Sequence, residues 1–244
     1  MNSSVQTIPL INLSLAFLPV FAVIAIHYRW TREHRNAVYA MGRMLTQLLL
    51  IGYFLTFLFD TDSGWVILLF VVVMVLVSSS IAIRTLRNRQ RLFYLKAIVS
   101  IVVGGGSILV LVTQGVLELT PWFLPSYFIP LAGMIFANAM NSVSLAAERL
   151  EAEIGRDVAY EKAREIAFKS SLIPITNSLL AVGLVSIPGM MTGQILAGVS
   201  PLIAARYQIM VMCMVYASAG IASACFLVLT RPDYLVNETT GQTA

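Results

Sequence analysis

The chain has 244 residues, of which 58% are hydrophobic and 11% are charged, and its mean hydropathy is +0.83. A soluble globular domain carries about 25% charged residues, so this composition excludes a soluble protein and indicates a polytopic membrane protein. The longest polar segment, residues 146–171, is too short to build a core of its own. We therefore expect one membrane domain over residues 1–244.

Seven apolar segments are long enough to cross a bilayer as helices, because a crossing takes about 20 residues. They cover residues 10–28, 38–59, 65–83, 93–113, 126–145, 172–191 and 207–229. The fourth contains Gly104-Gly105-Gly106-Ser107 at mid-depth, where small residues allow a neighbouring helix to approach closely. The predicted fold class is an all-α integral membrane protein with about seven transmembrane helices.

Lysine and arginine are distributed very unevenly along the chain. With the N-terminus outside, the cytoplasmic segments are residues 29–35, 84–96, 146–171 and the C-terminal tail, which hold three, five, five and one of the sixteen basic residues. Because basic loops stay in the cytoplasm, this distribution predicts an extracellular N-terminus and a cytoplasmic C-terminus. It also explains the net charge of +4, since basic loops face the anionic inner leaflet, and nucleic acid is not an expected partner.

The stretch over residues 183–210 is apolar but repeatedly interrupted. The interrupting residues are Pro188, Gly189, Gly193, Gly198 and Pro201. Irregular backbone at membrane depth is tolerated only where it packs inside protein or lines a wet cavity. The stretch, which joins the sixth and seventh predicted helices, is therefore either part of a translocation path or its outer gate, or a kinked helix followed by an ordinary external loop.

Polar side chains inside the predicted helices are a second indication of a path. Arg43 and Gln47 are four residues apart and share a helix face. Such residues either face the bundle interior and mark a pathway, or form hydrogen bonds that only hold the helices together. The path candidates are Arg43, Gln47, Asn138, Asn141, Asn177, Pro188, Gly189, Met190, Met191, Gly193 and Gln194.

Catalytic chemistry has little support in the sequence. No glycine-rich loop ends in Lys-Ser or Lys-Thr, so no phosphate-binding loop is expected, and the apolar segments lack a Ser-His-Asp or paired-carboxylate pattern. His27 and His34 have no partners at metal-ligand spacing. Methionine thioethers such as those of Met190 and Met191 bind soft metals, but their irregular spacing favours packing. We expect neither a catalytic site nor a cofactor in this chain.

Residues 146–171 mix charges of both signs, and their second half, 157–169, predicts a short helix. Asp157 is expected to cap its start and Lys169 to lie at its end. A short cytoplasmic helix between two transmembrane helices either docks into a groove of a partner protein or lies on the membrane surface. The residues predicted to contact such a partner are Asp157, Tyr160, Glu161, Arg164 and Phe168.

Four stretches together, residues 42–53, 129–141, 172–178 and 183–210, resemble the FetB-type permeases. These are the membrane subunits of an ABC transporter assigned to iron export, and their plant relatives are associated with aluminium tolerance. The resemblance implies a permease in the plasma (inner) membrane that pairs with a separate ATP-binding subunit, with two copies of each. ATP is then bound by the partner, and the substrate is iron, another metal ion or a small solute. The alternatives are a seven-span receptor or scaffold, and a secondary transporter.

Overall fold

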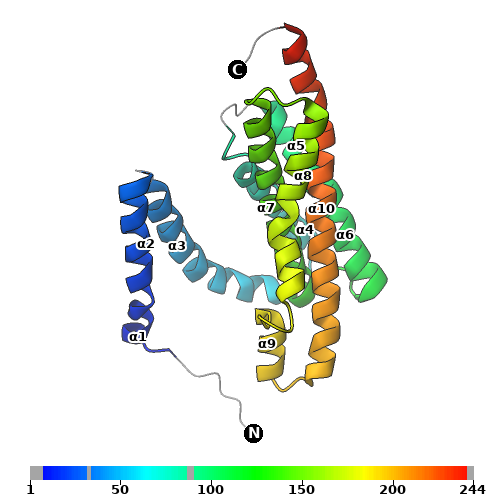
Figure 1. Cartoon of the computed structure of the whole chain (residues 1–244). Helices are drawn as coiled ribbons and strands as arrows, with labels where there is room; N and C mark the ends of the chain where they lie inside the picture. The colour runs from blue at the N-terminus through cyan, green and yellow to red at the C-terminus, as the bar shows by residue number, and fades with distance from the viewer. Residues whose placement is uncertain (1–7, 32–33, 87–90, 241–244) are drawn as a thin grey trace. The chain divides into compact units, whose positions relative to one another are not determined.

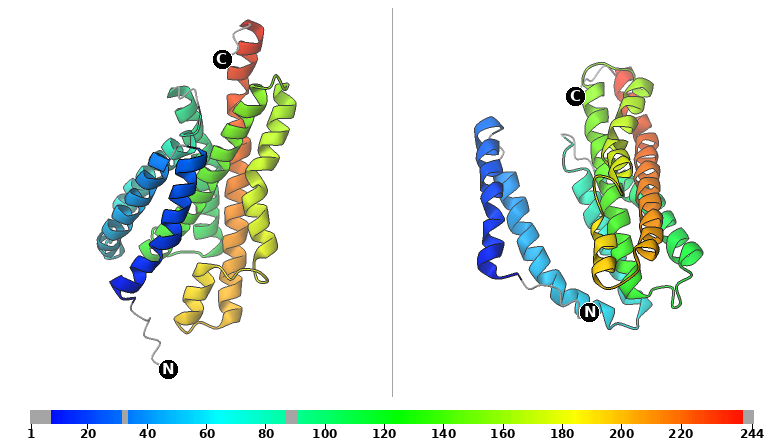
Figure 2. Two further views of the ribbon diagram at one scale, coloured as in Figure 1. Left: turned by 60° about the vertical axis from the view of Figure 1, so that its left-hand side comes forward. Right: turned by 60° about the horizontal axis from the view of Figure 1, so that its bottom comes forward.

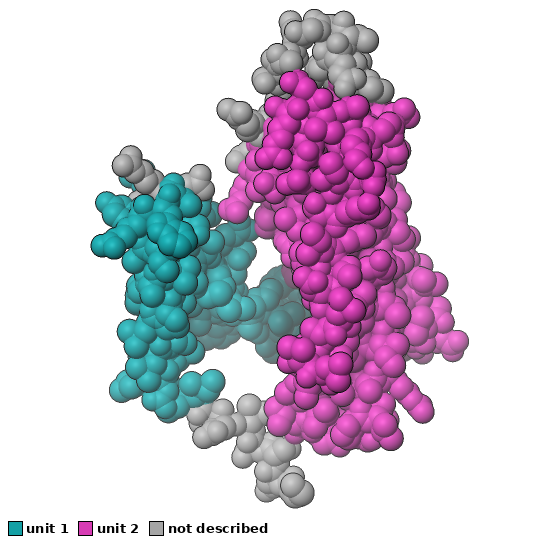
Figure 3. All heavy atoms as spheres, viewed as in Figure 1, with its two compact units in different colours: residues 1–62 teal, residues 63–244 magenta. Residues whose placement is uncertain are grey.

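The computed structural model describes residues 8–31, 34–86 and 91–240, and within these ranges the backbone is almost entirely helical (Figures 1 and 2). In the same ranges the only strand-like pairing is an isolated bridge between Val182 and Ser186. The chain divides into two compact units, Met1–Asp62 and Ser63–Ala244 (Figure 3). The fold is therefore all-α, as the composition predicts.

The first unit is a helical hairpin. α1 (Leu10–Leu15) and α2 (Phe17–Trp30) are separated by one residue, and α3 (His34–Phe59) packs against α2. None of the α2 residues is buried, because two helices alone cannot enclose each other's side chains. Both arms are long and apolar enough to cross a membrane, as the first two apolar segments predict.

The second unit is a bundle built around α7 (Pro125–Ile154) and α10 (Pro201–Thr240), which pack against each other. The surrounding helices are α4 (Gly64–Ala82), α5 (Arg91–Ile101), α8 (Tyr160–Ala181) and the short α9 (Gly189–Leu196). α7 and α10 run in one direction and α8 runs in the opposite one (Figure 1). The largest fully buried side chains of this unit include Ile101, Ile135, Phe136, Met214 and Phe226.

The rod that begins with α5 contains two π-helical segments, separated by one short α-helical segment. The π-helical η1 (Val102–Gly106), α6 (Ser107–Val110) and the π-helical η2 (Leu111–Val116) complete one rod. A Cβ added at Gly104 would lie 2.5 Å from the backbone nitrogen of Ala222 on α10, and one added at Gly105 would lie 2.8 Å from the Phe136 ring on α7. Both helices therefore approach this rod so closely that only glycine fits, which confirms the close packing predicted at this glycine run.

Many hydroxyl groups of the bundle are satisfied within their own helices. Donors to a carbonyl three or four residues earlier include the hydroxyls of Ser79, Ser100, Ser107, Thr113, Ser218 and Ser223. Between helices, the Tyr94 hydroxyl donates to the Leu76 carbonyl at 3.2 Å, and the Ser142 hydroxyl donates to the Ser171 carbonyl at 3.4 Å. Contact between the helices thus relies largely on apolar side chains and small residues.

In the part of the chain that the structure describes, six helices are long and apolar enough to cross a membrane. They are Ile11–Trp30, Arg35–Phe59, Gly64–Ala82, Arg91–Val116, Pro125–Ile154 and Pro201–Pro232. The continuous helix predicted over residues 172–191 is wrong, because α8 joins the predicted cytoplasmic helix to the first part of that segment and ends at Ala181. Beyond this end, Val182 adopts an extended conformation with a ψ of 132°, and Gly183 follows with a φ of +82°, which glycine adopts readily.

The start of α8 also differs from the prediction. Asp157 lies in the preceding loop with a φ of +60°, and the helix begins at Tyr160 after Ala159, with no side-chain cap. The loop is compact, since the Val158 N–H donates to the Glu153 carbonyl at 3.2 Å. Asp157 is therefore exposed at the corner between α7 and α8 instead of capping a helix. Residues 155–159 form this turn, which we call the α7–α8 corner.

Candidate functional site

The interrupted stretch predicted over residues 183–210 folds as a turn, a short helix and a second turn. In the first turn the Gly183 N–H donates to the Ser186 carbonyl at 2.9 Å, and Pro188 then precedes α9. In the second turn Gly198 adopts a φ of +91° before α10 begins. α9 packs against α10, and the two lie side by side at one end of the second unit (Figures 1 and 2). The predicted interruption is confirmed.

The path candidates on α9 fall into two groups. Met190, Met191 and Gln194 are half-buried, whereas Gly189 and Gly193 are exposed. A Cβ added at either glycine would meet no atom within 4 Å. Packing within the second unit therefore does not require glycine at these two positions, and larger side chains can be placed there without disturbing the fold.

Two glutamine side chains of the α9–α10 hairpin carry buried amide oxygens without a hydrogen-bond partner in the described part of the chain. They belong to Gln194 on α9 and Gln208 on α10, and Gln208 is only 6% exposed. An unpaired buried acceptor costs about 1–3 kcal/mol, and such groups call for an explanation such as a water, a ligand or another conformation. Gln208 is not among the predicted candidates. Like Gln47, however, it is a polar residue inside a predicted transmembrane segment, and this criterion could have identified it.

The three asparagines predicted for the path lie on α7 and α8. Asn138 is half-buried and donates to the Met134 carbonyl of its own helix at 2.8 Å. Asn141 and Asn177 are exposed, and no hydrogen bond within the described ranges joins the three side chains to one another. An exposed amide at membrane depth is costly against lipid, so these two positions are where we expect a water-filled space or another protein surface.

Arg43 and Gln47 belong to the first unit. They share one face of α3 with Tyr39, Gly42 and Thr46, and together these residues line a shallow depression. The predicted i, i+4 arrangement is therefore present, and Arg43 is half-buried while Gln47 is exposed. The other nine path candidates belong to the second unit.

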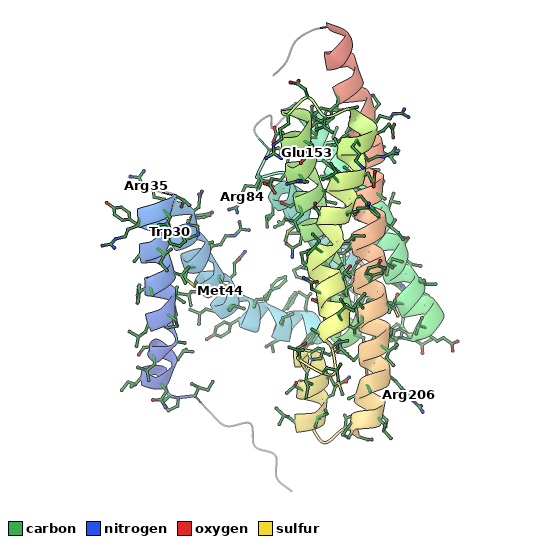
Figure 4. All side chains as sticks on the ribbon, in the orientation of Figure 1. Trp30, Arg35, Met44, Arg84, Glu153 and Arg206 are labelled. Atoms are coloured by element: carbon green, nitrogen blue, oxygen red, sulfur yellow. The ribbon has the colours of Figure 1, made fainter. Side chains whose placement is uncertain are left out.

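A buried carboxylate organises the α7–α8 corner (Figure 4). The Glu153 side chain is 7% exposed, and its Oε1 atom lies 2.7 Å from Arg149 Nη2 and 3.2 Å from Arg156 Nη1. The Glu153 carbonyl also accepts the N–H groups of Arg156 and Val158. Glu153 thus holds two arginine side chains through its carboxylate and the backbone of the turn through its carbonyl. A glutamate within a run of mixed charges resembles a solvated surface residue, which is why sequence reasoning did not single it out.

The residues predicted to contact a partner are divided between surface and interior. Asp157 and Glu161 are exposed and Arg164 is half-buried, so these three charges are open to a partner. Tyr160, in contrast, is 3% exposed, and its hydroxyl donates to the Leu227 carbonyl on α10. This burial raises the pKa of the Tyr160 hydroxyl.

An apolar cluster joins α7, α8 and α10 behind the corner. It consists of Ala146, Leu150, Tyr160, Ala163, Ala167 and Leu227, with Phe168 packed against it. On the exposed side of α8, Glu165 lies between Lys162 and Lys169 at 2.9 and 2.6 Å, and the hydrogen bonds from Lys169 and Lys162 lower the pKa of Glu165 to about 2. The start of α8 therefore has a charged outer face and a fixed apolar inner face.

The two ends of the second unit differ in charge. Arg84 and Glu153 lie towards one end, with the corner and the C-terminal part of α10, whereas Arg206 lies near the other, beside the start of α10 (Figure 4). Most of the basic residues that the structure describes in this unit belong to segments at the first end, residues 84–86, 91–96 and 149–169. The orientation of these ends relative to a membrane stays a prediction.

Metal-binding side chains are not clustered in the described residues. Among them, no group of three or more His, Cys, Asp or Glu side chains is placed to hold a metal ion. Cys213, which is exposed, and Cys225, which is half-buried, are both free.

Long apolar helices in a bundle with charged ends define an integral, polytopic helical membrane protein. The chain belongs to the family described as Uncharacterised protein family (UPF0014), whose model matches residues 10–235.

Three relatives show how far the similarity extends. The chain is 36% identical over 213 residues to the UPF0014 membrane protein slr1647 of Synechocystis sp., which covers 80% of this chain and 81% of the relative. It is 32% identical over 237 residues to the Probable iron export permease protein FetB of Escherichia coli, with 88% and 90% covered. It is 32% identical over 241 residues to Protein ALUMINUM SENSITIVE 3 of Arabidopsis thaliana, with 92% and 86% covered. No solved structure matches the chain. The resemblance to the FetB-type permeases is confirmed.

Proposed function

We propose that the chain is the membrane permease of an ABC-type exporter in the plasma (inner) membrane, which moves iron, another metal ion or a small solute. Energy comes from a separate ATP-binding subunit, which binds the ATP, and two copies of the permease form the path. The Escherichia coli relative named as a probable iron export permease supports export, and the Arabidopsis relative named for aluminium sensitivity supports a metal ion as the substrate.

The α7–α8 corner is the observation that carries this proposal. It presents exposed charges of both signs at Arg156 and Asp157, and Glu161 adds a further exposed charge on the first turn of α8. Beneath them the buried Glu153 ion pairs and the apolar cluster hold the corner on three helices. A surface of this kind suits a partner that pushes on the membrane domain, because a rigid base transmits a displacement that a loose surface loop would absorb.

α8 supplies a seventh crossing in this proposal. After its last charged residue, Lys169, it continues for twelve residues to Ala181, a rise of about 18 Å, whereas the hydrocarbon core is about 30 Å thick. The helix thus reaches part of the way across, and the Val182–Ser186 turn and α9 complete the crossing. With this crossing the N-terminus is outside and the C-terminus is cytoplasmic.

The α9–α10 hairpin is the proposed path or its outer gate. Broken helices near the substrate site are a recurring feature of transporters, and the unpaired amide oxygens of Gln194 and Gln208 offer acceptors for a cation, a water or a hydrogen-bond donor. Asn141 and Asn177 offer further polar groups on α7 and α8. Met190 and Met191 add thioethers beside them.

A seven-span receptor or scaffold and a secondary transporter remain the competing classes. The presence of an ATP-binding partner discriminates among all three. The test is gentle affinity purification of the tagged protein from its own membranes, followed by mass spectrometry. A stoichiometric ATP-binding subunit is the expected result, and its absence in several detergents would refute the ABC-type assignment.

A further inference from the structure

The first residue of α8 is hydrogen-bonded to the C-terminal part of α10, the longest helix of the bundle. Tyr160 donates its hydroxyl to the Leu227 carbonyl of α10, and both residues are almost fully buried. The single hydroxyl hydrogen of Thr230 is shared between the Phe226 carbonyl at 2.9 Å and the same Leu227 carbonyl at 3.2 Å. The Leu227 carbonyl therefore keeps a partner on its own helix, while the Tyr160 hydroxyl is the directional contact between the two helices.

Further contacts connect the start of α8 with the C-terminal part of α10. Glu161 Oε1 lies 3.1 Å from Arg231 Nη2 on α10, at the exposed surface above Tyr160. The Tyr160 ring lies 6.1 Å from the Tyr234 ring, which in turn lies 6.2 Å from the Phe93 ring on α5. A hydrogen bond, an ion pair and ring packing thus join the start of α8 to the C-terminal part of α10.

α10 is a stiff element between this junction and the interrupted hairpin. The proline inside the helix is Pro232, beyond the junction, so the helix runs from Pro201 to Leu227 without an internal proline. These 27 residues span about 40 Å at 1.5 Å per residue. α9 packs against α10, next to the turn that contains Gly198. A displacement of α10 at Leu227 therefore moves the end that carries Gln208 and contacts α9.

We propose that Tyr160 is a positioning residue that makes the α7–α8 corner and α10 move as one body, so that a displacement imposed on the corner reaches the α9–α10 hairpin. This inference rests on the proposed function, since it takes the ATP-binding subunit as the source of the displacement. In this proposal α10 carries the displacement from the corner to the hairpin. α8 alone does not carry it, because α8 ends at Ala181, before the hairpin.

The decisive variant is Tyr160→Phe, which keeps the ring in the apolar cluster and removes only the hydroxyl. Tyr216→Phe is the matched control, because Tyr216 lies on α10, is 42% exposed and has no hydrogen bond in the described part of the chain. Arg231→Gln is a second test variant. It breaks an exposed ion pair, so its folding is expected to be unaffected.

The experiment measures the movement of α10 in the assembled complex with the ATP-binding subunit, in lipid nanodiscs. Spin labels at Trp65→Cys on α4 and Leu202→Cys on α10, both exposed positions of the second unit, are placed in a Cys213→Ala, Cys225→Ala background. Pulsed electron paramagnetic resonance gives the distance distribution without nucleotide and with ATP plus vanadate. ATP hydrolysis is recorded on the same samples.

In the parent protein and in Tyr216→Phe, nucleotide is expected to shift the distance distribution. In Tyr160→Phe we expect the shifted population to fall at least threefold while hydrolysis stays within twofold, and Arg231→Gln should show a smaller loss. A full nucleotide-dependent shift in Tyr160→Phe, or no shift in the parent, would overturn the inference. If Tyr160→Phe does not fold, a full shift in Arg231→Gln overturns it and a reduced shift supports it. Failure of the parent to assemble with any ATP-binding subunit would count against the proposed function instead.

Discussion

Replacing Gly104 with alanine tests the close packing of η1 against α10. The added Cβ would lie 2.5 Å from the Ala222 nitrogen and 2.7 Å from its Cα, whereas ordinary contacts begin near 3.4 Å, so α10 has to move by about an ångström. Overpacking of this kind costs about 1–3 kcal/mol. The neighbouring atoms belong to backbone and cannot rotate away, which places the expected cost in the upper half of that range.

Gly106→Ala is the matched control for this substitution. It lies in the same π-helical segment, and the nearest atom to its added Cβ is 3.9 Å away. Both variants gain a similar helix propensity, about 1 kcal/mol over glycine, so the difference between them isolates the clash. At about 2–4 °C per kcal/mol for a unit of this size, the apparent midpoint of Gly104→Ala should lie about 4–12 °C below that of Gly106→Ala.

The assay is thermal unfolding of the purified protein in one detergent at one scan rate, because membrane proteins often unfold irreversibly and their midpoints then depend on the rate. Intrinsic fluorescence of the three tryptophans reports the transition. Equal midpoints for the two variants would refute the reasoning, since they would mean that α10 does not approach η1 as closely as described.

Four further outcomes follow from the structure. Glu153→Gln should lower the apparent midpoint, because a buried hydrogen bond to a charged group is worth about 1.5–3 kcal/mol, and unchanged unfolding would show that the corner does not depend on this carboxylate. Gln208→Met should raise the midpoint by about 2–12 °C, as it removes an unpaired acceptor costing about 1–3 kcal/mol, and a lower midpoint would mean that the amide has a partner. Gly193→Leu should leave membrane insertion and folding intact but block transport in vesicles, since its Cβ position is open; normal transport would favour the external-loop interpretation. Glu165 has a depressed pKa, so its contribution to stability is present above its ordinary pKa of 4.5 and is lost as the pH falls towards about 2; in carboxyl-resolved NMR, Lys169→Met should shift the titration of Glu165 upwards.

The sequence predicted the features that depend on composition and on single special residues. Apolar length located the spanning helices, the glycine run at Gly104 indicated a close helix contact, and the prolines and glycines after Gly183 indicated an interrupted helix. Each of these rests on a local property, either burial of apolar side chains or the conformational freedom of glycine. Such properties can be read without knowing which helices are neighbours.

The prediction for α8 failed for a physical reason. Sequence reasoning ended one helix at Lys169 and began another at Leu172, because charge gives way to apolar residues there. A change in hydropathy does not interrupt backbone hydrogen bonds, however, and no glycine or proline stands between the two residues. Pro174 lies only a few residues further on, but the helix continues through it to Ala181.

The remaining site residues depend on tertiary contacts. Tyr160 was predicted to be part of a docking surface, yet it is buried because Leu227, some 67 residues away along the chain, lies beside it. Glu153 acquires its significance from burial together with its ion pairs, and Gln208 from the burial of an unpaired amide oxygen. Whether a polar residue is exposed, paired or unpaired is decided by the neighbouring helices, and a single sequence does not specify those neighbours.

The hydroxyl groups that bond within their own helices affect how the bundle deforms. When one helix slides past another, a hydrogen bond inside either helix travels with it and is not broken, so hydroxyls such as those of Ser79 and Ser223 place no enthalpic barrier in the way of shear. Resistance then comes from interlocking side chains, which yield in small steps, and from a few cross-links such as the bond between Tyr94 and Leu76. The helices of such a bundle can slide past one another along most of their contacts. They are held at a few interhelical hydrogen bonds, and those bonds decide which helices move together.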